Sequence, residues 1–428
     1  MGLGLNFMSL EETPHTLDGS AAAKAEVGGL LAEADACWRR GGREGVAAAV
    51  ARCDEALGRL VEACEADRAR VWLRRGQILE SGRSEGDLRE AVRSHDAGLA
   101  ELARAVTRDA GRDEAGGVAG ERERGRLSAL LWMNRGNALL ASGSPEQARE
   151  AARSYDEALA IADRGMAAEM RGESAAMIGA AWLNRAAASA LGWPDETGRH
   201  EQGRCLRRAI EALSLAAEAG QAAARRNLAG AWFNLAAWHE ARGEMPAASA
   251  AWREAARAAA PEAGRDFVAL ETGLRASHAL CVAQARRIVG GEEIDEAERR
   301  ELFARVEEGL AACASWTGAG HPGASVNPEA TASRLFEFGA WWWHRAAPEA
   351  LAGFLRRWGD GAGAERLETA RVAAEVARQE ILQGGFETLA GEGGESRRAR
   401  LRELSALVEH FSNRQQACRQ ARTSSAFG

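Results

Sequence analysis

Three asparagines recur at a constant distance from a tryptophan and are the clearest repeated polar residues in the chain. Asn134, Asn184 and Asn234 each follow a tryptophan by two residues, and Asn137 lies about one helical turn beyond Asn134. A carboxamide carries both hydrogen-bond donors and an acceptor, which suits it to repeated hydrogen bonding. The recurrence is compatible with a row of ligand-binding groups or with a hydrogen bond repeated between structural units.

Arginines stand beside these asparagines, at Arg74, Arg75, Arg135 and Arg185. A guanidinium can hold a carboxylate through two parallel hydrogen bonds. That carboxylate can belong to a binding partner or to an acidic residue on the next helix, and the sequence leaves both possibilities open.

The densest aromatic cluster is the run Trp341, Trp342 and Trp343, with Phe336 and Phe338 close before it. Three consecutive residues cannot all face one side of a helix. Because tryptophan is enriched at interface hot spots, the run predicts a partner interface. The alternative is a terminal core that packs on both sides of one helix.

Residue spacings typical of catalysis or metal binding are missing from the sequence. The eight histidines never form an H-E-x-x-H pattern, and the seven cysteines are scattered without a C-x-x-C pair. Neither a phosphate-binding loop nor a nucleophile elbow is present. We therefore expect no catalytic residue, no metal and no cofactor. An enzyme built on helical repeats is a remote alternative.

The elements that must position these residues are expected to be helices. Alanine, leucine, arginine and glutamate dominate the 428 residues, and Tyr155 is the only tyrosine. These common residues are strong helix formers, whereas runs of strand-forming residues are absent. The composition predicts an all-α protein.

Charge and hydropathy restrict the partners and the compartment. The net charge is −7, with acidic and basic residues interspersed, so nucleic acid is not an expected partner. No apolar run approaches the roughly 18 residues of a membrane-spanning helix, and the N-terminus does not resemble a signal peptide. The scattered thiols suit a reducing cytoplasm, and the strong bias toward arginine is typical of a GC-rich bacterial genome.

Four segments share a repeated helical pattern that begins at Trp72, Trp132, Trp182 and Trp232, spaced by 60, 50 and 50 residues. A second helical pattern follows each segment, and an earlier pair surrounds Trp38. Such self-similarity is typical of repeat proteins, in which each unit buries its apolar face against its neighbours. We expect about five helical hairpins between residues 20 and 262.

The spacing within one copy predicts how its two helices interlock. Trp132 and Gly136 lie one turn apart on the first helix, and Ala151, Tyr155 and Ala158 share a face of the second. The large indole fills the gap between the two helices, and the small residue one turn later lets the partner helix come close, so that two such faces interlock.

The pattern resembles the tetratricopeptide repeat (TPR) family. The fourth copy places seven residues where the family has W, G, Y, G, A, F or Y, and A: Trp232, Ala236, His239, Gly243, Ala248, Trp252 and Ala255. The family period is about 34 residues, so the longer period here implies longer helices and longer loops, such as residues 108–125, and a long insert at residues 193–203.

The resemblance implies a right-handed superhelical solenoid whose first helices line a concave groove. In such a groove, Asn134, Asn137, Asn184 and Asn234 would hold the backbone of an extended peptide. The resemblance likewise implies that Arg74, Arg135 and Arg185 flank the groove and can hold a partner's carboxylate.

We expect a flexible N-terminus at residues 1–20, a repeat solenoid at 21–262, a helical C-terminal extension or cap at 263–420 and a flexible tail at 421–428. Helices are expected near residues 265–289, 295–316, 362–383 and 395–419. The expected function is that of a non-enzymatic, cytoplasmic scaffold that binds a protein or peptide. The alternative is a structural or regulatory subunit of a larger complex, bound through its convex or C-terminal aromatic surface.

Overall fold

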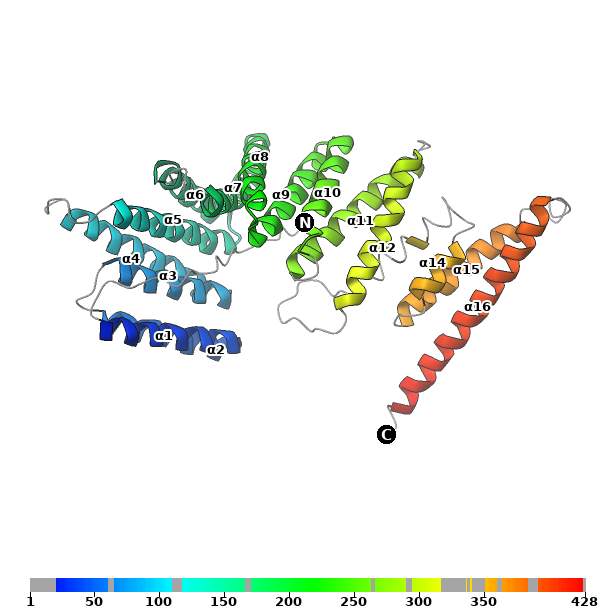
Figure 1. Ribbon diagram of the computed structural model, residues 1–428, viewed down its shortest axis with the longest axis horizontal. Coiled ribbons are helices and arrows are strands. Elements are labelled where there is room, and N and C mark those ends of the chain that lie inside the picture. Colours follow the sequence, from blue (N-terminus) through cyan, green and yellow to red (C-terminus); the bar gives the residue numbers. More distant parts are fainter. Residues whose placement is uncertain are drawn as a thin grey trace. The chain divides into compact units, whose positions relative to one another are not determined.

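A computed structural model describes residues 21–60, 65–109, 118–165, 171–262, 266–289, 295–316, 336, 339–340, 351–359, 364–383 and 392–425. Every regular element in these ranges is a helix, as Figure 1 shows. The helices are α1 (Ala21–Arg40), α2 (Gly42–Arg59), α3 (Glu65–Gly82), α4 (Glu85–Asp109), α5 (Val118–Ala141), α6 (Pro145–Gly165), α7 (Arg171–Gly192), α8 (Glu196–Glu218), α9 (Ala222–Ala241), α10 (Met245–Ala259), α11 (Phe267–Val289), α12 (Glu296–Trp316), α14 (Leu351–Gly359), α15 (Ala364–Gln383) and α16 (Glu392–Ser425). The all-α fold class is confirmed.

The chain forms two compact units, residues 1–244 and 245–428. Ten helices, α1 to α10, lie between residues 21 and 259, and α1 to α8 account for four of the five expected hairpins. The boundary between the units falls between α9 and α10, so the fifth hairpin stays a prediction.

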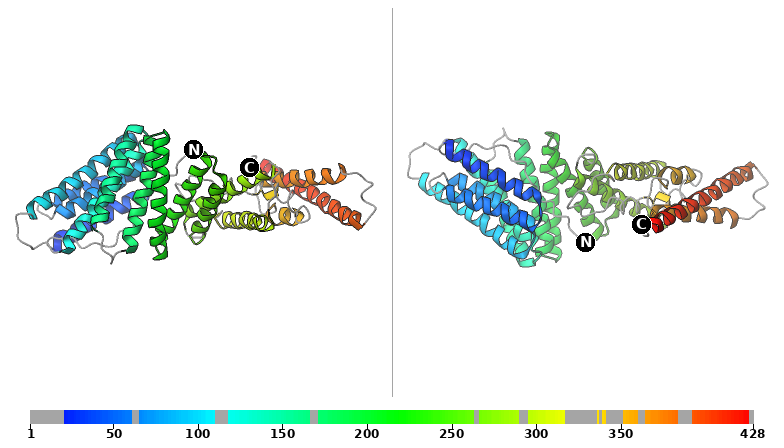
Figure 2. Two further views of the ribbon diagram at one scale, coloured as in Figure 1. Left: turned by 90° about the horizontal axis from the view of Figure 1, so that it is seen from above. Right: turned by 90° about the horizontal axis from the view of Figure 1, so that it is seen from below.

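In the first unit, consecutive helices pack as hairpins, α1 with α2, α3 with α4, α5 with α6 and α7 with α8. Each hairpin also packs on the next one along the chain, and Figure 2 shows these helices side by side from two directions. One core joins α5, α6 and α7, and another joins α7, α8 and α9. This stacking of helical hairpins is the TPR-like solenoid arrangement that the sequence predicts.

The predicted interlocking of small and large residues is confirmed in two hairpins. A Cβ atom built on Gly136 of α5 would lie 2.7 Å from Cε1 of Tyr155, which is fully buried on α6. In the preceding hairpin, Gly76 of α3 contacts the ring of His95 on α4 in the same way. The two helices of each hairpin approach closely because glycine leaves room for the ring.

The four repeated tryptophans are half-buried and bridge helices at the edges of the cores. Trp72 packs against the core of α1 to α3, and Trp132 against that of α5 to α7. Trp182 contacts the cores on both sides of α7, and Trp232 packs against the core of α7 to α9. Each indole therefore fills space between helices while keeping part of its surface in water.

Two predicted loops are shorter than expected. Helix α5 begins at Val118, inside the predicted loop at residues 108–125, and an ion pair between Glu123 and Arg126, one turn apart, supports this first part of the helix. Helix α8 begins at Glu196, so most of the insert predicted in the third copy is helical. Asp195 caps it by accepting a hydrogen bond from the Gly198 amide at 2.9 Å.

In the second unit, a hydrophobic core joins α11, α12, α14, α15, α16 and the buried Phe336. Phe336 stacks on Phe354 of α14 with ring centroids 5.4 Å apart. Helices α11, α12 and α15 lie within two residues of their predicted bounds. Helix α16 is longer than expected and continues to Ser425, so residues 421–425 of the expected tail are helical.

Candidate peptide-binding surface

Three of the four candidate asparagines are buried and hydrogen-bonded inside the first unit. Asn134 donates from Nδ2 to the carbonyl oxygen of Leu130 at 2.9 Å, within its own helix. The Oδ1 atom of Asn137 accepts from the hydroxyl of Tyr155 and from Nδ2 of Asn184, both at 2.9 Å. Asn137 and Asn184 are only 2% and 7% exposed. The bond from Asn184 to Asn137 joins two repeats, which is one of the interpretations that the sequence leaves open.

Asn234 on α9 differs from the other three asparagines. It is half-buried, and no described residue hydrogen-bonds its side chain. The repeat explains the difference, because Asn184 reaches back to Asn137 on the preceding first helix. The position that aligns with Asn137 on α7 is Ala187, which has no side-chain acceptor. The side chain of Asn234 therefore makes no hydrogen bond to a described residue.

A second unused carboxamide lies two turns earlier on the same helix. Asn227 and Asn234 are seven residues apart, a spacing that places both on one face of α9. Asn227 is 1% exposed, and neither its amide nitrogen nor its oxygen has a partner among the described residues. Buried polar atoms without partners are uncommon in folded proteins, so this face of α9 is chemically distinct from its counterparts on α5 and α7.

The candidate arginines form ion pairs between helices. The Nε atom of Arg135 donates to Asp96 on α4 at 2.7 Å, while its Nη atoms donate to Glu150 at 2.5 Å and Ser154 at 2.8 Å on α6. Its guanidinium lies 5.6 Å from the ring centre of Trp132. Burial lowers the pKa of Arg135, but the hydrogen bonds to Asp96 and Glu150 raise it by more. The charge is neutralised inside the stack.

Similar arginine contacts recur in the neighbouring hairpins, in the sets Arg75, Asp54, Glu90 and Ser94, and Arg185, Asp156, Ser189 and Glu201. Arg74 pairs with Asp35 and Gln77, and its guanidinium lies over Trp38. The acidic residues on neighbouring helices are therefore the present partners of these arginines. A role in holding a ligand carboxylate stays a prediction.

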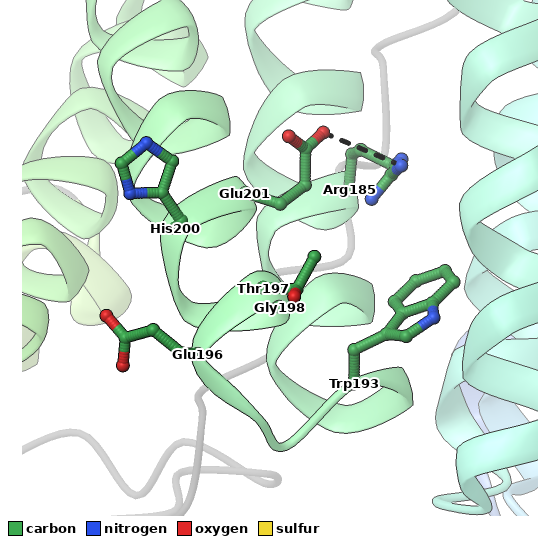
Figure 3. A pocket seen from close by; sticks show the side chains of 7 residues that line it. All are labelled: Arg185, Trp193, Glu196, Thr197, Gly198, His200 and Glu201. Carbon is green, nitrogen blue, oxygen red and sulfur yellow. Dashed lines mark ion pairs between the residues drawn. The ribbon is translucent and has the colours of Figure 1, made fainter.

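A hollow of about 530 Å³ lies at the turn between α7 and α8, and Figure 3 shows the side chains around it. The residues that line it are Arg185, Trp193, Glu196, Thr197, Gly198, His200 and Glu201. Arg185 lies 5.8 Å from the ring centre of Trp193 and pairs with Glu201. The hollow is absent from the sites that the sequence predicts, although Trp193, Pro194 and Asp195 form a turn and helix-capping signal in the sequence.

The hollow depends on a tight turn. A Cβ atom on Gly198 would collide with the carbonyl oxygen of Trp193, so only glycine fits there. Every charged group in the hollow already has a partner: Glu196 pairs with Arg242 at 3.0 Å, and Glu201 pairs with Arg204 at 2.6 Å. The hydrogen bond from Arg204 is the main reason why the pKa of Glu201 is lowered.

The remaining candidates for a functional site are the tryptophan run, the cysteines and possible metal ligands. Trp341, Trp342 and Trp343 lie outside the described residues. Burial raises the pKa values of the Cys53 and Cys205 thiols to about 12, so both stay protonated near neutral pH and are poor nucleophiles. In the described part of the chain, no group of three or more acidic, histidine or cysteine side chains is placed to hold a metal ion. None of the described helices is both long enough and apolar enough to cross a bilayer.

Comparisons with known proteins identify no family. No protein-family model matches the chain, and no curated protein matches it. Among solved structures, a Rap protein complexed with competence and sporulation factor is 12% identical, with 91% of this chain and 99% of that chain covered and a TM-score of 0.32. A circular tandem repeat protein is 16% identical, with 95% and 99% covered and a TM-score of 0.32. At this level of similarity, membership of the TPR family is not established.

Proposed function

We propose that the chain is a non-enzymatic scaffold that binds another protein or a peptide through the α9 face that carries Asn234. The support is the carboxamide of Asn234, which is half-buried and has no hydrogen-bond partner among the described residues, whereas Asn184 at the aligned position donates to Asn137. Such a carboxamide can donate one hydrogen bond to the backbone of an extended peptide and accept another from it. The peptide-binding proposal therefore centres on Asn234 rather than on the whole row of asparagines.

In this proposal, the buried asparagines and the paired arginines stabilise the helix stack and do not contact the partner. Asn137 and Asn184 join α5 and α7, and Arg135 joins α4, α5 and α6. Contacts of this kind hold the stacked helices in place before a partner arrives. A preorganised surface loses little conformational entropy on binding, which raises its affinity for a partner. Asn134, Arg74 and Arg185 would act in the same indirect way.

The first test is the Asn234→Ala variant in the full-length chain. Partners are captured from the native host and identified by mass spectrometry, and the main partner is then titrated against each variant. We expect Asn234→Ala to weaken binding about 5- to 20-fold, because one or two hydrogen bonds are lost. The thermal unfolding midpoint should not change.

The matched control is Asn413→Ala, which removes an exposed asparagine on α16 in the second unit. This variant should bind as the natural chain does. Equal affinity of the Asn234→Ala variant and the natural chain would argue against the α9 face as the binding site. The alternative role, as a subunit bound through the aromatic run at residues 341–343, stays a prediction, as does the cytoplasmic location.

A further inference from the structure

The same ion pair joins three first helices to the hairpin that precedes each of them. An arginine three residues after the repeated tryptophan donates to an aspartate on the preceding second helix at 2.7–2.9 Å, in the pairs Arg75 with Asp54, Arg135 with Asp96 and Arg185 with Asp156. On α9 the aligned residue is Leu235, which is 5% exposed in the core of α7 to α9. The α9 interface, defined as the contacts of α9 with the hairpin α7–α8, therefore lacks this ion pair.

A hydrogen bond between successive first helices is also missing from the α9 interface. Nδ2 of Asn184 on α7 donates to Oδ1 of Asn137 on α5 at 2.9 Å, whereas Asn234 has no partner in the part of the chain that the structure describes. The residue on α7 that aligns with Asn137 is Ala187, whose methyl group accepts no hydrogen bond. Two polar contacts that hold α7 in the stack thus have no counterpart at α9.

Asn227 places an unsatisfied polar group in the α9 interface. It lies four residues before Ala231 and so shares the face of α9 that packs in the core of α7 to α9. The side chain is 1% exposed, and neither Oδ1 nor Nδ2 has a hydrogen-bond partner among the described residues. An amide buried in this way loses its hydrogen bonds to water without replacement, which costs free energy in the closed structure. Opening of the interface removes this cost, because water then solvates the amide.

The other copies avoid this cost at the aligned position, five residues before the tryptophan. The residues there are all buried, and they are Asp67, Leu127 and Met177. Leu127 and Met177 are apolar and pack in cores with neighbouring helices, while Asp67 pairs with Arg70 at 2.5 Å. An apolar or a paired side chain therefore fits at this position, and the unsatisfied amide is particular to α9.

Other contacts keep α9 docked on the preceding hairpin. Nε1 of Trp238 donates to the carbonyl oxygen of Arg199 at 2.7 Å, and Arg242, at the C-terminal end of α9, pairs with Glu196 at 3.0 Å. Leu235 adds apolar packing in the core of α7 to α9. The interface is closed in the structure, and the missing polar contacts lower the free energy that is needed to open it.

We propose that the α9 interface is the weak point of the first unit, at which α9 separates from the hairpin α7–α8 more often than α5 or α7 separates from the hairpin before it. In the open state water solvates Asn227, and Asn234 on the same face of α9 becomes more accessible. A partner that binds the open state more tightly than the closed state would shift the population toward it, in proportion to that difference in affinity. The opening itself depends only on contacts within the stack and does not require the peptide-binding role of Asn234.

Hydrogen–deuterium exchange of the full-length chain at neutral pH, with no partner present, tests this weak point. Amides exchange when the helix that contains them opens, so their exchange rates compare the stability of successive interfaces. We expect the amides of α9 to exchange at least about fivefold faster than those of α5 and α7, because one unsatisfied buried amide accounts for a factor of this size. Failure of the peptide-binding proposal would leave this result unaffected.

Substitution of Asn227 tests the cause. Asn227→Leu gives α9 the apolar residue that α5 has at Leu127, and it should slow exchange in α9 at least about fivefold. Asn227→Met, which copies Met177, serves if leucine does not fit, since methionine is flexible and fills irregular space. The gain in protection should be larger in α9 than in α3, which is the internal reference. Asn413→Ala is the matched control and should leave exchange in α9 unchanged.

Ala187→Asn tests the interface without a change at Asn227. It places on α7 the acceptor that Asn137 supplies on α5, and the new hydrogen bond from Asn234 should slow exchange in α9 about two- to tenfold. The weak point is overturned if α9 of the natural chain exchanges no faster than α7, or if the folded variants at positions 187 and 227 leave exchange in α9 unchanged.

Discussion

At the scale of single residues, one buried oxygen holds three helices together. The Oδ1 atom of Asn137 on α5 accepts hydrogen bonds from Tyr155 on α6 and from Asn184 on α7. All three side chains are buried, so none can exchange this contact for water without opening the stack. Buried polar groups of this kind cost free energy when one partner is removed, because the others remain without a hydrogen bond.

This contact gives a prediction for stability. Asn137→Ala leaves the hydroxyl of Tyr155 and the amide of Asn184 without their acceptor, and it should lower the free energy of unfolding by about 1–3 kcal/mol. Urea denaturation followed by circular dichroism measures the change. Asn413→Ala, at an exposed position, should stay within about 0.5 kcal/mol of the natural chain. An Asn137→Ala variant as stable as this control would show that water replaces the lost acceptor.

At the scale of helices, the distance between the two members of a hairpin is set by a glycine. The ring of Tyr155 packs on Gly136 of α5, and the ring of His95 packs on Gly76 of α3. Each ring comes from the second helix of its hairpin. The close approach depends on the missing Cβ atom rather than on backbone freedom, because both glycines lie inside regular helices.

Two glycines of α5 allow a matched test of this close approach. Gly136→Ala places a methyl group against the Tyr155 ring, and we expect a loss of about 1–3 kcal/mol from overpacking. Gly125→Ala meets nothing within 4 Å, and it should stabilise the helix by up to about 1 kcal/mol, since alanine is the better helix former. Thermal unfolding of both variants measures the contrast. Similar midpoints for the two would mean that the Tyr155 ring moves aside without cost.

At the scale of the whole molecule, contacts link each helix mainly to its neighbours in the chain. Hairpins of the first unit pack in sequence order, and the second unit has a hydrophobic core of its own. Because each unit buries its own apolar residues, each satisfies the main condition for folding alone. The boundary lies between Glu244 and Met245, whereas the sequence places it near residue 262. The predicted boundary stays a prediction, since compactness alone does not define a domain.

Independent folding can be tested with a fragment. Residues 1–244 expressed alone should keep a helical circular dichroism spectrum and slow amide exchange in α5 to α7, because every core contact of these helices lies inside the fragment. The full-length chain is the reference for exchange in the same helices. A fragment that binds hydrophobic dyes and exchanges its amides rapidly would show that the first unit needs residues beyond 244.

The amino-acid sequence alone was sufficient to predict the helices and their pairing. The periodic apolar residues, the repeated tryptophans and the pattern of glycine and tyrosine are local signals, and helix formation and hairpin packing depend on such short spacings. The interlocking faces that carry Gly136 and Tyr155 were predicted correctly because only one turn connects their helices. The ends of α5 and α8 were misplaced, since charged residues at a helix start look the same as a polar loop in sequence.

Only the tertiary structure decided which of these polar side chains have a hydrogen-bond partner among the described residues. Asn134, Asn184 and Asn234 look equivalent in sequence, yet Asn184 has a hydrogen-bond partner 47 residues away, and Asn234 has none in the part of the chain that the structure describes. Arg135 likewise meets Asp96 across 39 residues. A hydrogen bond depends on sub-ångström distances between helices of different repeats, and those distances follow from the packing of all the side chains between them.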